Sequence, residues 1–258
     1  MITLIYDLII GVSLPFFGTL SGAAFVLFTK NGISDKIQRM ISGFAAGVMV
    51  AAAVWSLLIP AMEHVSYLGI LSFVPAVVGF WLGIFTFAGA ERLLERYKLS
   101  DDNKGIKSIL VTVVAVVLHN FPEGMAVGVV YAGILSGEGL MSVAGAFALS
   151  LGIAVQNIPE GAIVSLPLKS IGYGKVKSFV YGVLSGVVEP IGAIITMLLF
   201  NLCLPIFPFF LGFAAGAMVY VVVEELIPEM TRGRCDDIGT LLFAVGFSLM
   251  MTLDVALG

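Results

Sequence analysis

The chain has 258 residues, of which 59% are hydrophobic and 12% charged, and its formal net charge is −4. Soluble domains are about half apolar and about a quarter charged, so a water-soluble fold of this composition would lack the polar surface that it needs. The composition therefore excludes a soluble protein and predicts an all-α polytopic membrane protein. The first residues, MITLIYDLII, have no basic region or cleavage site, and we interpret them as the start of a retained span.

All 13 Lys and Arg residues fall into four clusters, which leave no basic residue at 40–91, 108–168 and 178–231. A span needs about 20 apolar residues, so each stretch holds two spans, or a re-entrant pair. One further span at each end brings the total to eight, at about 4–29, 40–62, 68–94, 108–133, 140–167, 178–201, 207–230 and 237–257. Because cytoplasmic loops are rich in Lys and Arg, we expect both termini outside and a single transmembrane domain, 1–258, in the cell (inner) membrane.

The second and seventh spans contain an internal repeat. Gly43–Met62 is GFAAGVMVAAAVWSLLIPAM and Gly212–Met230 is GFAAGAMVYVVVEELIPEM, with a one-residue gap between the copies. The first copy runs outward and the second inward, as in the inverted repeats of many secondary transporters. Spans 1–3 and 6–8 would then be related, around central spans 4 and 5 (3+2+3). The alternative is convergence, since small residues favour close helix packing.

The central spans carry two related hexads, His119-Asn120-Phe121-Pro122-Glu123-Gly124 and Gln156-Asn157-Ile158-Pro159-Glu160-Gly161. Positions i and i+4 share one helix face, so each Glu lies on the same face as the first residue of its hexad. A proline inside a helix frees the carbonyl four residues earlier, and irregular backbone at membrane depth is found only inside protein or beside a water-filled path. The pattern predicts a polar site between spans 4 and 5.

Span 6 adds a third membrane carboxylate, Glu189, again followed by proline. Each acid costs about 2.5–3.5 kcal/mol at the centre of a span, and the spans that carry these three contain no Lys or Arg. The three acids are therefore either protonated, as in a proton relay, or neutralised by a bound cation. A cluster of His, Glu, Asn and Gln on adjacent helices favours the cation.

Imidazole with carboxylates suits Zn²⁺, Fe²⁺, Mn²⁺, Co²⁺ and Cd²⁺, whereas Mg²⁺ and Ca²⁺ prefer oxygen ligands. The absence of Cys from the cluster argues against a tight structural zinc site. Met49, in the first repeat copy, offers a soft thioether, although packing is an equal explanation for one Met among eleven. Cys203 and Cys235 fall on opposite sides of the membrane, so we expect no disulfide between them. The chain has no GxxxxGK[ST] motif, so transport would depend on an ion gradient.

The hexads HNFPEG and QNIPEG on consecutive spans resemble the ZIP family of divalent metal transporters, in particular its prokaryotic GufA-like branch. The resemblance covers the whole chain and implies a homodimer and a binuclear site between spans 4 and 5. The metal ligands that it implies are Met49, His119, Asn120, Glu123, Gln156, Asn157, Glu160 and Glu189.

Three positions depart from the family pattern. Many members have His where this chain has Gln156, a weaker ligand. Many have a His-rich loop where Leu99–Gly105 contains no His, and many end span 2 with a His motif where this chain has Ser56. Glu224 and Glu225 occupy the matching place in span 7, where they either line the cytoplasmic exit or are simply solvated.

We therefore expect a transporter that moves divalent transition-metal ions, Zn²⁺ first and Fe²⁺, Mn²⁺ or Cd²⁺ next, into the cytoplasm. The metal is cargo rather than cofactor, and we expect no catalytic residue and no nucleic-acid partner in this bilayer-embedded chain. An intramembrane metal-dependent hydrolase is one alternative, but such sites usually have two or three His ligands and the cluster offers only His119. A proton or cation channel would explain the acids but not the His and amide pairing.

Overall fold

The computed structural model describes residues 2–28, 34–99, 104–137, 142–170, 172–203, 206–233 and 236–257. Within these ranges the chain is helical and contains no β-strand. The α-helices are α1 (Ile2–Phe28), α2 (Asp35–Ala52), α3 (Ile59–His64), α4 (Phe73–Leu99), α5 (Lys104–Ser136), α6 (Val143–Ser170), α7 (Lys175–Gly186), α8 (Val188–Cys203), α9 (Phe207–Val221), α10 (Ile227–Thr231) and α11 (Ile238–Leu257). Among the segments that the structure describes in full, three differ in winding: the π-helices η1 (Ala53–Leu58) and η4 (Val222–Leu226), and the 3₁₀-helix η2 (Ser66–Leu71).

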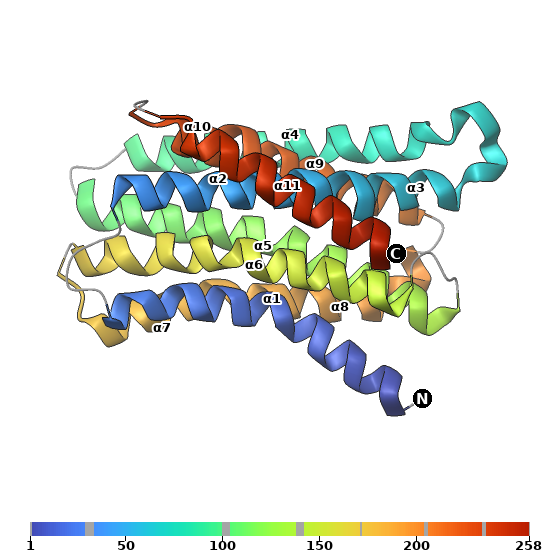
Figure 1. The fold of residues 1–258 in the computed structure, drawn as a ribbon, viewed down its shortest axis with the longest axis horizontal. Coiled ribbons are helices and arrows are strands. Elements are labelled where there is room, and N and C mark those ends of the chain that lie inside the picture. Colours follow the sequence, from blue (N-terminus) through green and yellow to red (C-terminus); the bar gives the residue numbers. More distant parts are fainter. Residues whose placement is uncertain are drawn as a thin grey trace.

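Seven helical segments are long and apolar enough to cross a membrane: Tyr6–Phe28, Asp35–His64, Phe73–Leu93, Val143–Leu166, Lys175–Phe200, Phe207–Thr231 and Ile238–Ala256. The prediction of an all-α polytopic membrane protein is thereby confirmed. The eighth predicted span corresponds to α5, but most side chains before Asn120 on that helix lie outside the described part, so the count of eight stays a prediction. The two chain ends lie at the same end of the molecule (Figure 1), as an even number of crossings requires.

Four helix pairs make the most extensive contacts: α1 with α6, α5 with α8, α2 with α11, and α4 with α9. Glycines make these contacts possible. A Cβ added to Gly22 would lie 1.8 Å from the carbonyl oxygen of Ile158, and one added to Gly47 would lie 2.1 Å from that of Phe243. In a bilayer the hydrophobic effect does not drive helices together, so their association depends on close van der Waals packing. Small residues permit this packing because they let the two backbones approach each other.

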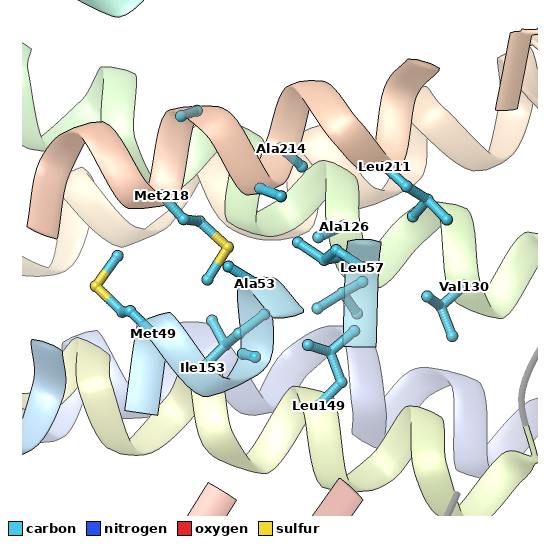
Figure 2. Close-up of a cluster of buried hydrophobic side chains, with 14 of the residues drawn as sticks. Met49, Ala53, Leu57, Ala126, Val130, Leu149, Ile153, Leu211, Ala214 and Met218 are labelled. Carbon is cyan, nitrogen blue, oxygen red and sulfur yellow. The ribbon is translucent and has the colours of Figure 1, made fainter. Parts of the chain in front are cut away.

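These pairs form two bundles, one of α1, α5, α6, α7 and α8 and the other of α2, α4, α9 and α11. Each bundle takes helices from both halves of the chain, so the two repeat units are interleaved rather than separate. Apart from Gly239, which approaches a carbonyl of α10, every close approach of a described glycine to a backbone carbonyl of another helix joins helices of one bundle. Between the bundles, side chains such as Ala53, Leu57 and Ile153 form a hydrophobic cluster (Figure 2).

The repeat of the second and seventh spans is visible in these contacts. Gly43 in the first copy packs against a carbonyl of α11, and its counterpart Gly212 packs against a carbonyl of α4. Figure 1 shows α2 and α9 running in opposite directions, as the inverted repeat predicts. Each copy turns π-helical at the same place, and η1 is one residue longer than η4. The one-residue gap between the copies therefore falls where π winding absorbs an extra residue.

Proline shapes the spans that meet at the site. Pro15 lies inside α1, which bends along its length in Figure 1. The sixth span consists of two helices, α7 and α8, which meet at Val187, whose backbone N–H donates to the Leu184 carbonyl at 3.3 Å. Pro190 has no N–H to continue the ladder, so Glu189 lies in the first turn of a new helix.

Candidate functional site

The two hexads lie on α5 and α6, which contact each other, and Glu189 comes from α8, which packs against α5. Six of the predicted ligand residues are brought together here, and each of their side chains is at most 8% exposed: Asn120, Glu123, Gln156, Asn157, Glu160 and Glu189. Buried polar side chains at this density require partners. Their hydrogen bonds therefore reveal which atoms the fold satisfies and which it leaves available.

A hydrogen bond joins the two hexads directly. The Gln156 amide donates from Nε2 to Oε1 of Glu123 at 2.6 Å, across the interface between α6 and α5. The sequence predicted that each helix would present its own pair, but here the first residue of one hexad contacts the acid of the other. One oxygen of the Glu123 carboxyl is occupied by this contact and the other is not.

The two hexad asparagines make matching contacts. Asn120 donates from Nδ2 to the backbone carbonyl of Ser185 at 3.2 Å, and Asn157 donates from Nδ2 to the backbone carbonyl of Pro15 at 3.4 Å. The first carbonyl lies on the sixth span and the second on the first span, which are counterparts in the inverted repeat. Each Asn therefore bonds through its N–H group to the backbone of another span, and its side-chain oxygen has no partner.

Glu189 is held on one oxygen by two donors. Its Oε1 accepts from the hydroxyl of Thr19 at 2.6 Å and from Nδ2 of Asn120 at 2.9 Å. Thr19 lies on α1 and is completely buried. Thr19 was not among the predicted site residues, because a single Thr in an apolar span has no periodic or motif signal. The one available signal was the Gly-Ala pair three residues later, Gly22-Ala23, which matches Gly192-Ala193 after Glu189.

The site contains a set of buried oxygens without hydrogen-bond partners. They are Oδ1 of Asn120, Oε2 of Glu123, Oε1 of Gln156, Oδ1 of Asn157, Oε2 of Glu160 and Oε2 of Glu189. With the carboxyl groups ionised, every atom in this set is an acceptor, so the six oxygens cannot pair with one another. A buried acceptor without a partner is costly, and a cation is the ligand that satisfies several acceptors at once.

The three carboxyl groups of Glu123, Glu160 and Glu189 interact electrostatically with one another. Within the described ranges, none of them forms a salt bridge with Lys or Arg. Among the described side chains, no three His, Cys, Asp or Glu groups are close enough to hold a metal ion by themselves. An ion at this site would therefore need the amide oxygens of Asn and Gln in addition to the carboxylates.

His119 and Met49 differ from this group. His119 lies on α5, but its side chain is outside the described residues, so its place stays a prediction. Met49 is 1% exposed and lies in the hydrophobic cluster between the bundles. Figure 2 shows Met49 on α2 and its repeat counterpart Met218 on α9 extending into the space between these helices. Its described surroundings are apolar, so its role as a ligand also stays a prediction.

Ser56 lies in η1 and has a partner that the sequence analysis did not name. Its hydroxyl donates to Oδ1 of Asp254 on α11 at 2.6 Å, both side chains are buried, and Oδ2 of Asp254 has no partner. An acid in the apolar stretch MTLDVAL is itself a signal, which would have identified Asp254. Glu224 and Glu225 lie in η4 with exposed side chains, and the Glu225 carboxyl interacts electrostatically with Glu160 and with Glu91.

Comparison with known proteins gives one consistent result. Residues 101–254 match the family model described as ZIP zinc transporter. The chain is 35% identical to the zinc transporter GufA of Myxococcus xanthus, over 92% of this chain and 93% of that protein. It is 32% identical to zinc transporter ZIP11 of Xenopus tropicalis, with 97% of each chain covered. It is also 32% identical to zinc transporter ZIPB of Bordetella bronchiseptica, over 97% of this chain and 81% of that protein. The chain belongs to the ZIP zinc transporter family.

Proposed function

We propose that this protein carries divalent transition-metal ions, Zn²⁺ foremost, across the membrane into the cytoplasm. The observation that supports this most is the set of six unpartnered oxygens on buried side chains of α5, α6 and α8. Three carboxylates without a described cationic partner need positive charge from outside the chain. The named relatives are zinc transporters, which supports transport rather than catalysis as the role of this site.

We further propose that the site binds two ions. One divalent ion is neutralised by Glu123 and Glu160, which lie on the contacting helices α5 and α6 and interact electrostatically. A second ion needs further negative charge, and Glu189 is the nearest source, with Oε2 unpartnered. A carboxylate can bridge two cations through its two oxygens. The amide oxygens of Asn120, Gln156 and Asn157 complete the coordination, together with His119.

The ligand chemistry favours Zn²⁺, with Fe²⁺, Mn²⁺ and Cd²⁺ as further candidates. A site of carboxylate and amide oxygens with one imidazole is of intermediate hardness. It lacks thiolates, so binding is weak enough for release. Gln156 in place of a second imidazole makes the site harder than a two-His site, and Met49 would add a soft ligand from α2 if that helix approaches.

Movement between the two bundles would expose the site to alternate sides. The site side chains come from the bundle of α1, α5, α6, α7 and α8, and within each bundle glycines bring backbones into contact. The contact between bundles consists of apolar side chains such as Ala53 and Ile153 (Figure 2), which slide more readily than interlocked backbones. Ser56 with Asp254 would line the outward path, and Glu224 and Glu225 the cytoplasmic path. A homodimer in the inner membrane, with both termini outside, completes the proposal.

Uptake of radioactive Zn²⁺ into proteoliposomes tests the function. The wild type should accumulate Zn²⁺ above protein-free vesicles, Cd²⁺ should compete, and Mg²⁺ should not. Glu123→Gln should reduce uptake at least tenfold. The matched control is Glu229→Gln, because Glu229 on α10 is not one of the six buried site residues and pairs with Arg232 at 3.6 Å. Metal-independent current, or uptake equal in the wild type and Glu123→Gln, contradicts the proposal.

A further inference from the structure

The inverted repeat extends from the spans into the site itself. A Cβ added to Gly124, the last residue of the first hexad, would lie 2.1 Å from the backbone oxygen of Glu189. One added to Gly161, the last residue of the second hexad, would lie 2.0 Å from the backbone oxygen of Thr19. The equivalent glycines Gly124 on α5 and Gly161 on α6 therefore pack against Glu189 on α8 and Thr19 on α1, respectively.

Two other contacts give the same correspondence. Gly192 packs against the backbone oxygen of Phe121, and Gly22 packs against that of Ile158, the matching residue of the other hexad. The hexad asparagines bond to Ser185 and to Pro15, each four residues before Glu189 and Thr19 respectively. By three independent contacts, Thr19 is the structural counterpart of Glu189. The site has a carboxylate on one side of its symmetry and a neutral hydroxyl on the other.

The two counterparts, Thr19 and Glu189, are hydrogen-bonded to each other. Thr19 donates to Oε1 of Glu189 at 2.6 Å, and Oε2 of the same carboxyl has no partner. Two donors on one oxygen, Thr19 and Asn120, fix the orientation of the carboxyl plane and direct the other oxygen away from them. Gly161 and Gly186 leave the room in which Thr19 fits, since a Cβ on Gly186 would lie 2.7 Å from the Thr19 Cβ.

We propose that Thr19 is a positioning residue that holds Glu189 so that its free oxygen faces the metal, and that it thereby sets the affinity of the ion that Glu189 binds. This inference rests on the proposed function. In this proposal Thr19 acts through Glu189, because its hydroxyl hydrogen is donated to that carboxyl. Charge-assisted hydrogen bonds of this kind are the strong ones, so losing the donor should measurably loosen the carboxyl.

The test measures Zn²⁺ binding to purified full-length protein by equilibrium dialysis. Thr19→Val keeps the side-chain volume and removes the donor, and it should weaken the binding step that depends on Glu189 about tenfold, which corresponds to about 1.4 kcal/mol. Thr19→Ser keeps the hydroxyl and should restore affinity to within about threefold. The matched control is Thr196→Val, because Thr196 is buried on α8 and its hydroxyl bonds only to Gly192 of its own helix in the described contacts.

The decisive comparison repeats Thr19→Val in a Glu189→Gln background. If Thr19 acts through the Glu189 carboxylate, the second substitution adds less than about twofold to the loss, since the two effects are coupled rather than additive. A full tenfold loss in that background, or equal affinities for Thr19→Val and Thr19→Ser, overturns the inference. Absence of Zn²⁺ binding in the folded wild type instead rejects the proposed function, and the inference with it. The thermal unfolding temperature of each variant verifies that it folds.

Discussion

The Nε2 of Gln156 lies 2.6 Å from the Oε1 of Glu123, so the hexads of two neighbouring helices are joined by one hydrogen bond inside the membrane region. This contact uses the amide N–H group and leaves the amide oxygen without a partner. The residue at this position therefore orients an acid and also presents an unpartnered oxygen, so changing it should alter metal preference.

We predict that Gln156→His tightens Zn²⁺ binding about tenfold while Mn²⁺ binding changes by less than about threefold. Imidazole is a stronger ligand for Zn²⁺ than an amide oxygen, whereas Mn²⁺ prefers oxygen. Gln156→Ala removes the donor to Glu123 and should weaken the binding of both Zn²⁺ and Mn²⁺. Competition binding with the two metals measures the ratio, and an unchanged ratio in Gln156→His would show that this residue does not face the ion.

A second prediction concerns the glycine that ends the first hexad. Gly124→Ala places a methyl group 2.1 Å from the Glu189 backbone oxygen, so α8 must move away. We expect a loss of stability of about 1–3 kcal/mol from overpacking and weaker metal binding, because Glu189 moves with its helix. Thermal unfolding and dialysis measure the two effects.

The control for this variant is Gly89→Ala on α4. A Cβ at Gly89 would meet nothing within 4 Å, and Ala favours helix over Gly, so this variant should be at least as stable as the wild type. Equal stability of Gly124→Ala and Gly89→Ala would contradict the close contact between α5 and α8.

Much of this architecture could be predicted from the sequence, and the reason is physical. Apolar length and the clustering of Lys and Arg identify spans, and the i, i+4 spacing on a helix determines which side of α5 carries Glu123. The similar sequences that begin at Gly43 and Gly212 indicated the inverted repeat. They are similar because equivalent glycines make equivalent close contacts, Gly43 with α11 and Gly212 with α4.

Other features depend on contacts between residues far apart in the chain, and no local pattern encodes them. Thr19 bonds to Glu189 and Ser56 bonds to Asp254, although each pair is separated by most of the sequence. Each bundle combines helices of both repeat units. Which helices pair depends on which glycine packs against which backbone carbonyl, and the order of the spans does not determine this. The π-helical winding of η1 appeared in the sequence as no more than a one-residue gap.

A third prediction concerns the contact between bundles. Ala53 is fully buried in the cluster of Figure 2, next to side chains of α5 and α6. Ala53→Phe should obstruct movement of one bundle past the other and abolish uptake, while Zn²⁺ affinity stays within about tenfold because the ligands are untouched. The control is Val245→Phe, since Val245 on α11 is 54% exposed. Normal uptake by Ala53→Phe would mean that this interface does not move.

Topology provides a fourth prediction. In a protein without Cys203 and Cys235, a cysteine at Ser136, at the exposed end of α5, should react with a membrane-impermeant maleimide added outside the cell. A cysteine at Gly174, exposed before α7, should react only after the membrane is permeabilised. Reaction of both positions from the same side would contradict the proposed orientation and the crossing of α6.

The most direct measurement counts the metal ions bound per chain, by mass spectrometry of dialysed protein at saturating Zn²⁺, in the wild type and in Glu160→Gln. Glu160 carries one of the three interacting carboxyls, and its Oε2 has no partner, so it should bridge both ions. We predict two ions in the wild type and at most one in Glu160→Gln, with uptake nearly abolished in the variant. Glu229→Gln should keep two ions and full uptake. One ion in the wild type at saturation, unchanged in Glu160→Gln, would contradict the two-ion site.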